Sequence, residues 1–143
     1  MLIKLLPEQA SNVWEDIKEA LEAALPPITG KQGTRMSNLL TSILLGDLTV
    51  WICVEEGVIH GMVITTFTCD IYSGTRTLLI YAIYGYGTAR SETWKDGMRT
   101  FLKFAKANNC QTIGAYTNEN NVIEIARSLG GNVENHYLTW NVE

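Results

Sequence analysis

The apolar positions of this chain alternate between two spacings, one typical of strands and one typical of amphipathic helices. They predict the element order β-α-α-β-β-β-α-β-α-β. The expected strands cover residues 2–6, 48–55, 58–70, 75–84, 111–117 and 133–142, and the expected helices cover 8–25, 34–45, 91–108 and 120–129. Two dipeptides predict where elements end: Pro26-Pro27 ends the first helix, and Glu56-Gly57 favours a tight hairpin turn.

The order of these elements predicts an α/β (α+β) fold with a mixed sheet. Three consecutive strands over 48–84 form an antiparallel meander, whereas the helix over 91–108 connects two strands that should pair in parallel. We expect this parallel pair, 75–84 and 111–117, at the middle of the sheet. Burial of both faces would explain why residues 78–84 are apolar without alternation.

Size and composition narrow the function classes. A chain of 143 residues predicts one domain spanning 1–143. Its net charge of −4 argues against nucleic-acid binding. No apolar run reaches the roughly 20 residues that span a bilayer, and the first residues lack a signal-peptide pattern. We therefore expect neither nucleic acid nor membrane as a partner.

The cysteines and histidines suggest no metal site. Cys53, Cys69 and Cys110 are odd in number and widely spaced, so we expect reduced, mostly buried thiols rather than disulfides or zinc ligands. His60 and His136 are equally isolated. Reduced thiols are typical of a cytoplasmic protein.

The most informative segment begins at the fourth expected strand. Leu78–Tyr84 leads into Gly85-Tyr86-Gly87, and the polar stretch Thr88-Ala89-Arg90-Ser91 then opens a long helix. Free backbone N–H groups and the positive end of the helix dipole coincide at such a position, so it can bind phosphate. The alternative is a plain turn at the end of a strand.

The order of elements resembles the GNAT superfamily of acetyl-CoA-dependent N-acyltransferases over essentially the whole chain. Members hold the coenzyme A pyrophosphate on an Arg/Gln-x-x-Gly-x-Gly/Ala loop at the position of Tyr84–Ser91. Two registers approach this motif, Arg90-x-x-Thr93-x-Lys95 and Tyr84-x-x-Gly87-x-Ala89, and both are degenerate. The resemblance implies acetyl-CoA as cofactor. It implies cofactor contacts from Tyr86, Gly87, Ala89, Arg90, Ser91, Thr93 and Asn120, with Asn118 or Asn121 as alternatives for the asparagine.

The catalytic residues of the superfamily match less well. Ala126 or Arg127 stands where many members have a tyrosine acid, and residues 75–84 contain no carboxylate that could act as a base. Tyr84 and Tyr81 are the candidate catalytic residues, with Asp70 and His136 as further options for a base. Trp94 lies near the expected glycines, and its indole would fill the pyrophosphate position if it pointed into the cleft.

Besides a small-molecule sensor that binds a nucleotide or an acyl group without turnover, two functions are compatible with these residues. One is an N-acyltransferase that moves an acetyl group from acetyl-CoA to an unidentified amine, on a small molecule or a protein, by direct attack. The other is a catalytically inactive GNAT-like protein used for binding or assembly, similar to short proteins encoded by tailed bacteriophages. The sequence leaves a homo-oligomer open in both cases.

Overall fold

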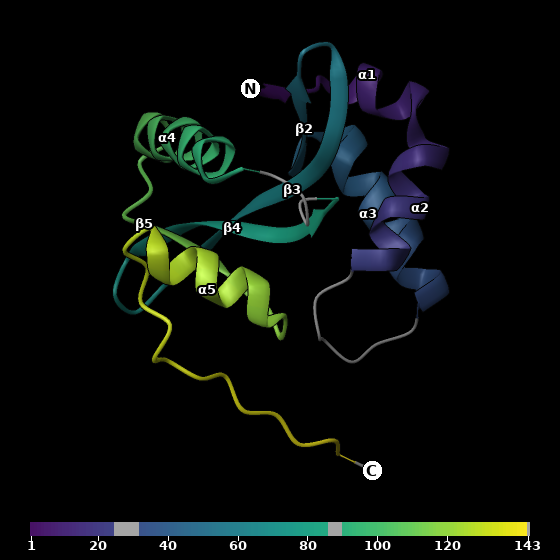
Figure 1. Ribbon diagram of the computed structural model, residues 1–143. Coiled ribbons are helices and arrows are strands. Elements are labelled where there is room, and N and C mark those ends of the chain that lie inside the picture. The colour runs from purple at the N-terminus through teal and green to yellow at the C-terminus, as the bar shows by residue number, and fades with distance from the viewer. Residues whose placement is uncertain (25–31, 86–89, 143) are drawn as a thin grey trace.

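The computed structural model describes residues 1–24, 32–85 and 90–142. Its strands form one sheet in the order β1-β2-β3-β4-β5 (Figure 1). The pairs from β1 to β4 are antiparallel, and β4 pairs with β5 in parallel. This mixed sheet confirms the predicted fold class. The strands are β1 (Leu2–Lys4), β2 (Leu48–Glu55), β3 (Val58–Asp70), β4 (Thr75–Tyr84) and β5 (Thr112–Ala115).

The turns of the meander follow from their residues. Glu56 and Gly57 both have positive φ angles, 52° and 77°, which is the geometry of a tight hairpin turn. At the next turn, the Asp70 carboxylate accepts hydrogen bonds from the Tyr72 N–H at 3.1 Å and the Ser73 hydroxyl at 2.9 Å. These two bonds hold the pKa of Asp70 below its usual value.

Three helices cover one face of the sheet: α1 (Pro7–Asn12), α2 (Trp14–Ala24) and α3 (Gln32–Leu45). They bury an apolar cluster that includes Leu21, Ile43 and Ile64. The single helix expected over 8–25 was wrong, because the chain breaks at Val13. There the Val13 N–H bonds the Ala10 carbonyl, a tighter link than that of an α-helix, and α1 turns to pack against α3.

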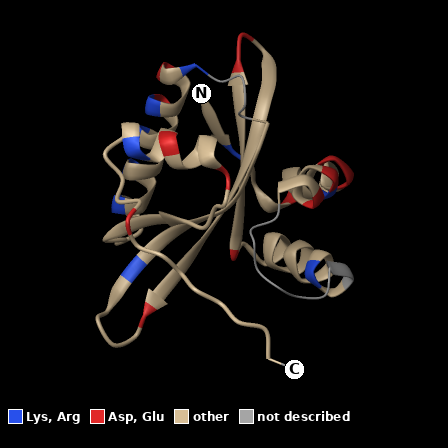
Figure 2. Cartoon of the chain, turned by 60° about the horizontal axis from the view of Figure 1, so that its bottom comes forward, with Lys and Arg blue, Asp and Glu red and all other residues tan. Residues whose placement is uncertain are grey.

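A second cluster fills the opposite face, under α4 (Ser91–Ala107). The Trp51 ring meets the edges of Phe101 and Phe104 at centroid distances of 5.2 and 5.0 Å. Its indole N–H donates to the Thr65 hydroxyl at 2.9 Å, which satisfies the buried polar groups on both strands. The basic residues of α4 are exposed and not part of this core; Figure 2 colours the basic and acidic positions along the whole chain. Those of α4 are Lys95, Arg99, Lys103 and Lys106.

The last part of the chain departs from the prediction. After α5 (Asn120–Ser128), residues 131–142 form neither helix nor strand, so the strand expected over 133–142 was wrong. Without it, β5 lies at the edge of the described sheet and not at its middle. The cysteines also differ in part: all three are free thiols, but Cys69 is exposed while Cys53 is buried and Cys110 half-buried.

Candidate functional site

The candidate site begins where the two parallel strands part. β4 and β5 pair from Thr77↔Thr112 to Ile80↔Ala115, and no pairing continues beyond that point in the described residues. β4 itself runs four residues further, to Tyr84, while the chain after β5 turns into α5. The carboxyl ends of parallel strands are where α/β proteins place ligands.

A β-bulge in β4 marks this point of divergence. Thr65 faces Ile80 and Ile64 faces Ala82, so Tyr81 has no partner residue on β3. A bulge bends its strand and increases the local twist. It also interrupts the alternation of faces: Ile80 and Ile83 pack in the α4-side cluster, whereas Tyr81 and Ala82 both pack on the side of α1–α3.

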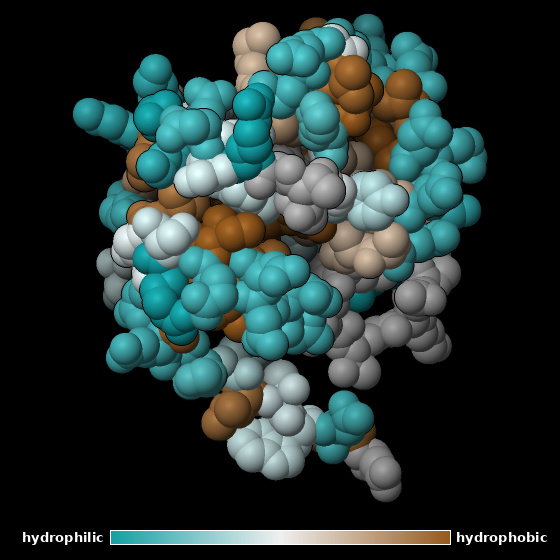
Figure 3. All heavy atoms as spheres, viewed as in Figure 1, coloured by the Kyte–Doolittle hydropathy of each residue, from teal (hydrophilic) through white to brown (hydrophobic). Residues whose placement is uncertain are grey.

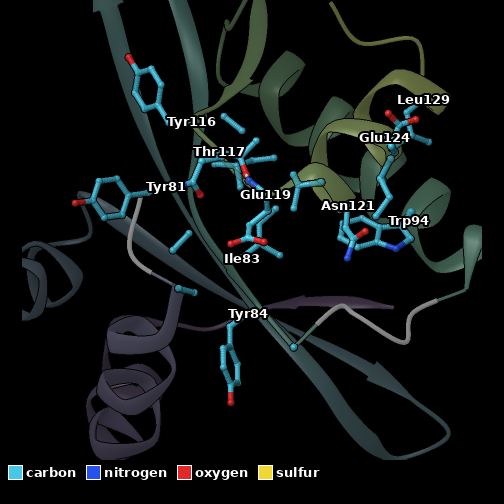
Figure 4. A pocket seen from close by; sticks show the side chains of 18 of the residues that line it. Tyr81, Ile83, Tyr84, Trp94, Tyr116, Thr117, Glu119, Asn121, Glu124 and Leu129 are labelled. Atoms are coloured by element: carbon cyan, nitrogen blue, oxygen red, sulfur yellow. The ribbon is translucent and has the colours of Figure 1, made fainter. Parts of the chain in front are cut away.

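The divergence opens a cavity of about 750 Å³, which we call the central pocket (Figure 4). Residues 80–85 of β4 and its exit form one wall, and residues 115–119 with α5 form the other. Ser91 and Trp94 at the start of α4 close one side, and Ala23 and Ala24 of α2 contribute from the opposite face of the sheet. This volume lies in the range of small-molecule and cofactor sites.

Tyr81 and Tyr84, the expected catalytic residues, both line the central pocket. Their rings point outward from its centre in Figure 4. The Tyr81 hydroxyl accepts hydrogen bonds from Nε and Nη2 of Arg35, at 2.9 and 2.7 Å, and the guanidinium lies 5.6 Å from the ring centroid. Tyr84 is 44% exposed. Their catalytic role stays a prediction.

A carboxylate that the sequence analysis missed lies in the middle of the pocket. Glu119 reaches it from the residue before α5, and Figure 4 places its carboxylate close to Ile83 of β4. Its backbone N–H donates to the Thr117 hydroxyl at 3.1 Å, which fixes the turn that presents it. The missed signal was position: the residue just before a helix that follows a parallel strand faces the same edge as the end of β4.

The asparagines at this turn divide into two groups. Of the three asparagines that the resemblance made candidates, Asn118 and Asn121 line the central pocket, whereas Asn120 does not. Figure 4 shows Asn121 beside the indole of Trp94. The side-chain amide of Asn121 therefore offers the pocket a hydrogen-bond donor and acceptor from the first turn of α5.

The start of α4 brings together only some of the expected cofactor residues. Ser91 lines the central pocket, while Arg90 precedes the helix, exposed, with no side-chain cap. Thr93 instead donates to the Glu55 carboxylate at 3.3 Å.

The expected cofactor residues Tyr86, Gly87 and Ala89 lie outside the described residues. Trp94 forms part of the wall, and the pocket keeps its volume beside the indole.

Gly85 shows why the exit of β4 needs a glycine. Its φ is +85°, and a Cβ there would lie 2.7 Å from the His60 carbonyl oxygen and 3.0 Å from the Gly61 Cα. The chain therefore leaves β4 in close contact with β3, in a conformation that other residues rarely adopt.

Within the described residues there is neither a cluster of metal ligands nor a helix that could span a membrane. No three His, Cys, Asp or Glu side chains in 1–24, 32–85 and 90–142 lie close enough to hold a metal ion. In the same ranges, no helix is both long and apolar enough to cross a bilayer.

No protein-family model matches the chain, and no curated protein sequence matches it either. Solved structures do match along its whole length. An aminoglycoside acetyltransferase from an uncultured soil metagenomic sample, in complex with sisomicin, superposes with a TM-score of 0.71 at 14% identity, over 100% of this chain and 95% of that one.

Two further matches are similar in extent. A predicted acetyltransferase from Clostridium acetobutylicum, solved with acetyl-CoA, gives a TM-score of 0.68 at 20% identity over 99% of this chain and 95% of its own. A ribosomal-protein-alanine N-acetyltransferase from Brucella melitensis biovar Abortus 2308 gives 0.68 at 10% identity over 99% of both chains. At such identities the likeness concerns the fold: the chain has the fold of the GNAT acetyltransferases.

Proposed function

We propose that this protein is an N-acetyltransferase that uses acetyl-CoA and acts on a primary amine. One observation carries the proposal: the central pocket lies between the parted ends of β4 and β5 and touches the N-terminus of α4. Structures with this fold include complexes with acetyl-CoA and with coenzyme A, which supports the same cofactor here.

The residues present suit such a cofactor. The first turn of α4, with Ser91 in the pocket wall, offers backbone N–H groups and the positive end of the helix dipole to phosphates. Arg90 adds a cation one residue before this turn. The β4 edge beyond Ile80 has lost its β5 partner in the described sheet, so its backbone groups can bond an extended ligand.

Acetyl-CoA would supply an activated thioester: as an unprotonated amine bonds to the acetyl carbon, the C–S bond breaks and coenzyme A leaves as a thiolate, which takes up a proton. The protein must then hold the amine and take up its proton. Glu119 is the carboxylate placed for this step, because it stands in the middle of the pocket opposite Ile83. Backbone N–H groups near Ile83 would stabilise negative charge on the carbonyl oxygen.

The charged residues on the two sides of the central pocket suggest from which side each substrate approaches. The exposed cations of α4 favour entry of the anionic cofactor from that side. On the other side α2 carries the acidic residues Glu15, Asp16, Glu19 and Glu22, and its last turn reaches the pocket. We propose that the acceptor is a cationic amine, on a small molecule or a protein, that approaches past α2.

The second candidate is a GNAT-like binding or assembly protein without catalysis, similar to short phage-encoded proteins. It is favoured by Ala126, which offers no acid where many members have a tyrosine, and by Arg35, whose hydrogen bonds engage the Tyr81 hydroxyl. For either function we propose a cytoplasmic location, on the strength of three free thiols.

A thermal-shift titration with acetyl-CoA and free coenzyme A tests the proposal. Ligand at a hundredfold excess over Kd stabilises the native state by about 2.7 kcal/mol, which raises Tm by roughly 5–10 °C in a chain of this size. No rise at millimolar ligand would eliminate the transferase and leave the binding protein.

The variant Arg90→Ala identifies the phosphate contact. We expect it to weaken coenzyme A binding about tenfold while Tm without ligand stays within 1 °C, because Arg90 is exposed and has no side-chain capping bond. Arg99→Ala, further along α4, is the matched control: it removes the same charge without a phosphate contact, so it should weaken binding far less than Arg90→Ala. Equal binding by both variants would remove Arg90 from the site.

A further inference from the structure

The C-terminal segment, residues 131–142, exposes an unusual amount of apolar surface. Tyr137, Leu138, Trp140 and Val142 are 76%, 70%, 79% and 96% exposed. The segment leaves the body beside α5 and projects from it (Figures 1 and 3). Single exposed apolar residues are ordinary, but four within six positions of extended chain are typical of an interaction element.

A complementary surface lies on the same chain, along β5. This strand pairs with β4 on one side, and its other edge has no strand partner in the described residues. Beside that edge is a groove of about 840 Å³, which we call the edge groove. Apolar side chains are visible between α4 and α5 in Figure 3, and the groove is lined there by Met98, Phe101, Ile113, Val122 and Ile125.

The chain's own C-terminal segment borders this groove without closing it. Tyr137 touches the Tyr116 ring at a centroid distance of 5.8 Å, at the end of the groove. No backbone hydrogen bond joins the segment to β5 in the part of the chain that the structure describes. Beyond Thr139 the segment no longer lines the groove. The side chain of Trp140 accordingly stays 79% exposed.

We propose that the C-terminal segment docks on β5 of a second copy of this chain, in a two-fold dimer in which each copy lends its segment to the other. The donor segment and the acceptor edge occur together on one chain, which is the condition for a closed, self-complementary interface. Strand addition would pair the bare edge of β5, and alternate side chains would enter the edge groove.

The size and charge of the segment suit this occupant. A buried Tyr or Trp contributes about 150–250 Å², so Tyr137 and Trp140 of both copies supply roughly 600–1,000 Å² before Leu138, Val142 and the backbone are counted. This approaches the roughly 1,200 Å² at which stable interfaces begin. Glu134 is the one charged side chain in 131–142, and β5 carries none, so docking of the segment on this strand brings no like charges together there.

The mass in solution gives the first test. Light scattering at about 50 µM should report twice the 15.9 kDa of one chain. The double variant Leu138→Asp/Trp140→Asp should halve that mass. Ile71→Asp/Tyr72→Asp changes two equally exposed apolar residues at the β3–β4 turn and should stay dimeric. A parent protein at 15.9 kDa, or a dimer that survives the segment variant, overturns the proposal.

Crosslinking then shows which copy receives the segment. In a background with Cys53, Cys69 and Cys110 replaced, one preparation carries Ala115→Cys and another carries Leu138→Cys. A bifunctional maleimide should join the two kinds of chain when they are mixed. Absence of this mixed product overturns the exchange, as does a crosslink that forms only within a chain carrying both substitutions. The test needs no cofactor, so it is independent of the proposed activity.

Discussion

Gly85 gives the sharpest test of how the site is built. Gly85→Ala adds a methyl group whose carbon would sit 2.7 Å from the His60 carbonyl oxygen, in a residue with φ of +85°. The left-handed conformation costs about 1–2 kcal/mol for a residue with a side chain. Forcing the backbone of β4 away from β3 costs about 1–3 kcal/mol more, as overpacking does elsewhere. We expect a total loss of about 2–5 kcal/mol.

Gly74→Ala is the matched control for this prediction. Gly74 has nearly the same φ, +72°, but a Cβ there would meet nothing within 4 Å. Its substitution should therefore cost only the conformational part, about 1–2 kcal/mol. At roughly 3 °C per kcal/mol, Gly85→Ala should lower Tm by about 6–15 °C and Gly74→Ala by about 3–6 °C.

Urea denaturation followed by far-ultraviolet circular dichroism measures both losses, and thermal melts provide an independent check. Equal destabilisation by the two substitutions would refute the reasoning, because it would mean that the close approach of Gly85 to His60 has no cost. A Gly85→Ala protein as stable as the parent would refute the reasoning more strongly, because it would mean that neither the close contact nor the positive φ of Gly85 costs free energy when a side chain is added.

Three further predictions concern the pocket and the fold. Glu119→Gln should lower kcat by about 10²-fold or more, because the variant lacks the base that accepts the proton of the amine. The affinity for coenzyme A should stay unchanged, because Glu119 contacts no phosphate. Glu124→Gln, at a residue that lines the same pocket, is the control, and equal kcat values for the two variants would disprove the role of Glu119. Tyr81→Phe should lower the free energy of unfolding by about 1–2 kcal/mol in urea denaturation, since Arg35 loses the hydroxyl that accepts two of its hydrogen bonds, and an unchanged midpoint would contradict this pair. Asp70→Asn should be less stable than the parent at pH 7. Because folding lowers the pKa of Asp70, its contribution is present above the usual value of 3.8 and is lost as the pH falls through the lower folded value, so Tm measured from pH 7 to 2 should converge at the acid end.

The sequence by itself determined the local elements and one long-range relation. The spacing of apolar residues predicted every described strand and the helices α3, α4 and α5, because periods of two and of 3.6 residues decide which face can be buried. The helix between β4 and β5 also predicted their parallel pairing correctly, since a crossover returns the chain in the same direction.

Tertiary structure decided what the sequence left open. The bulge at Tyr81 depends on the register between β3 and β4, which no local period encodes. Glu119 lies in the site because α5 begins opposite the end of β4, which the sequence pattern did not reveal. The segment expected as a strand over 133–142 has the composition of one, yet a strand exists only when a neighbouring edge pairs with it, and this chain does not pair its own β5 with that segment.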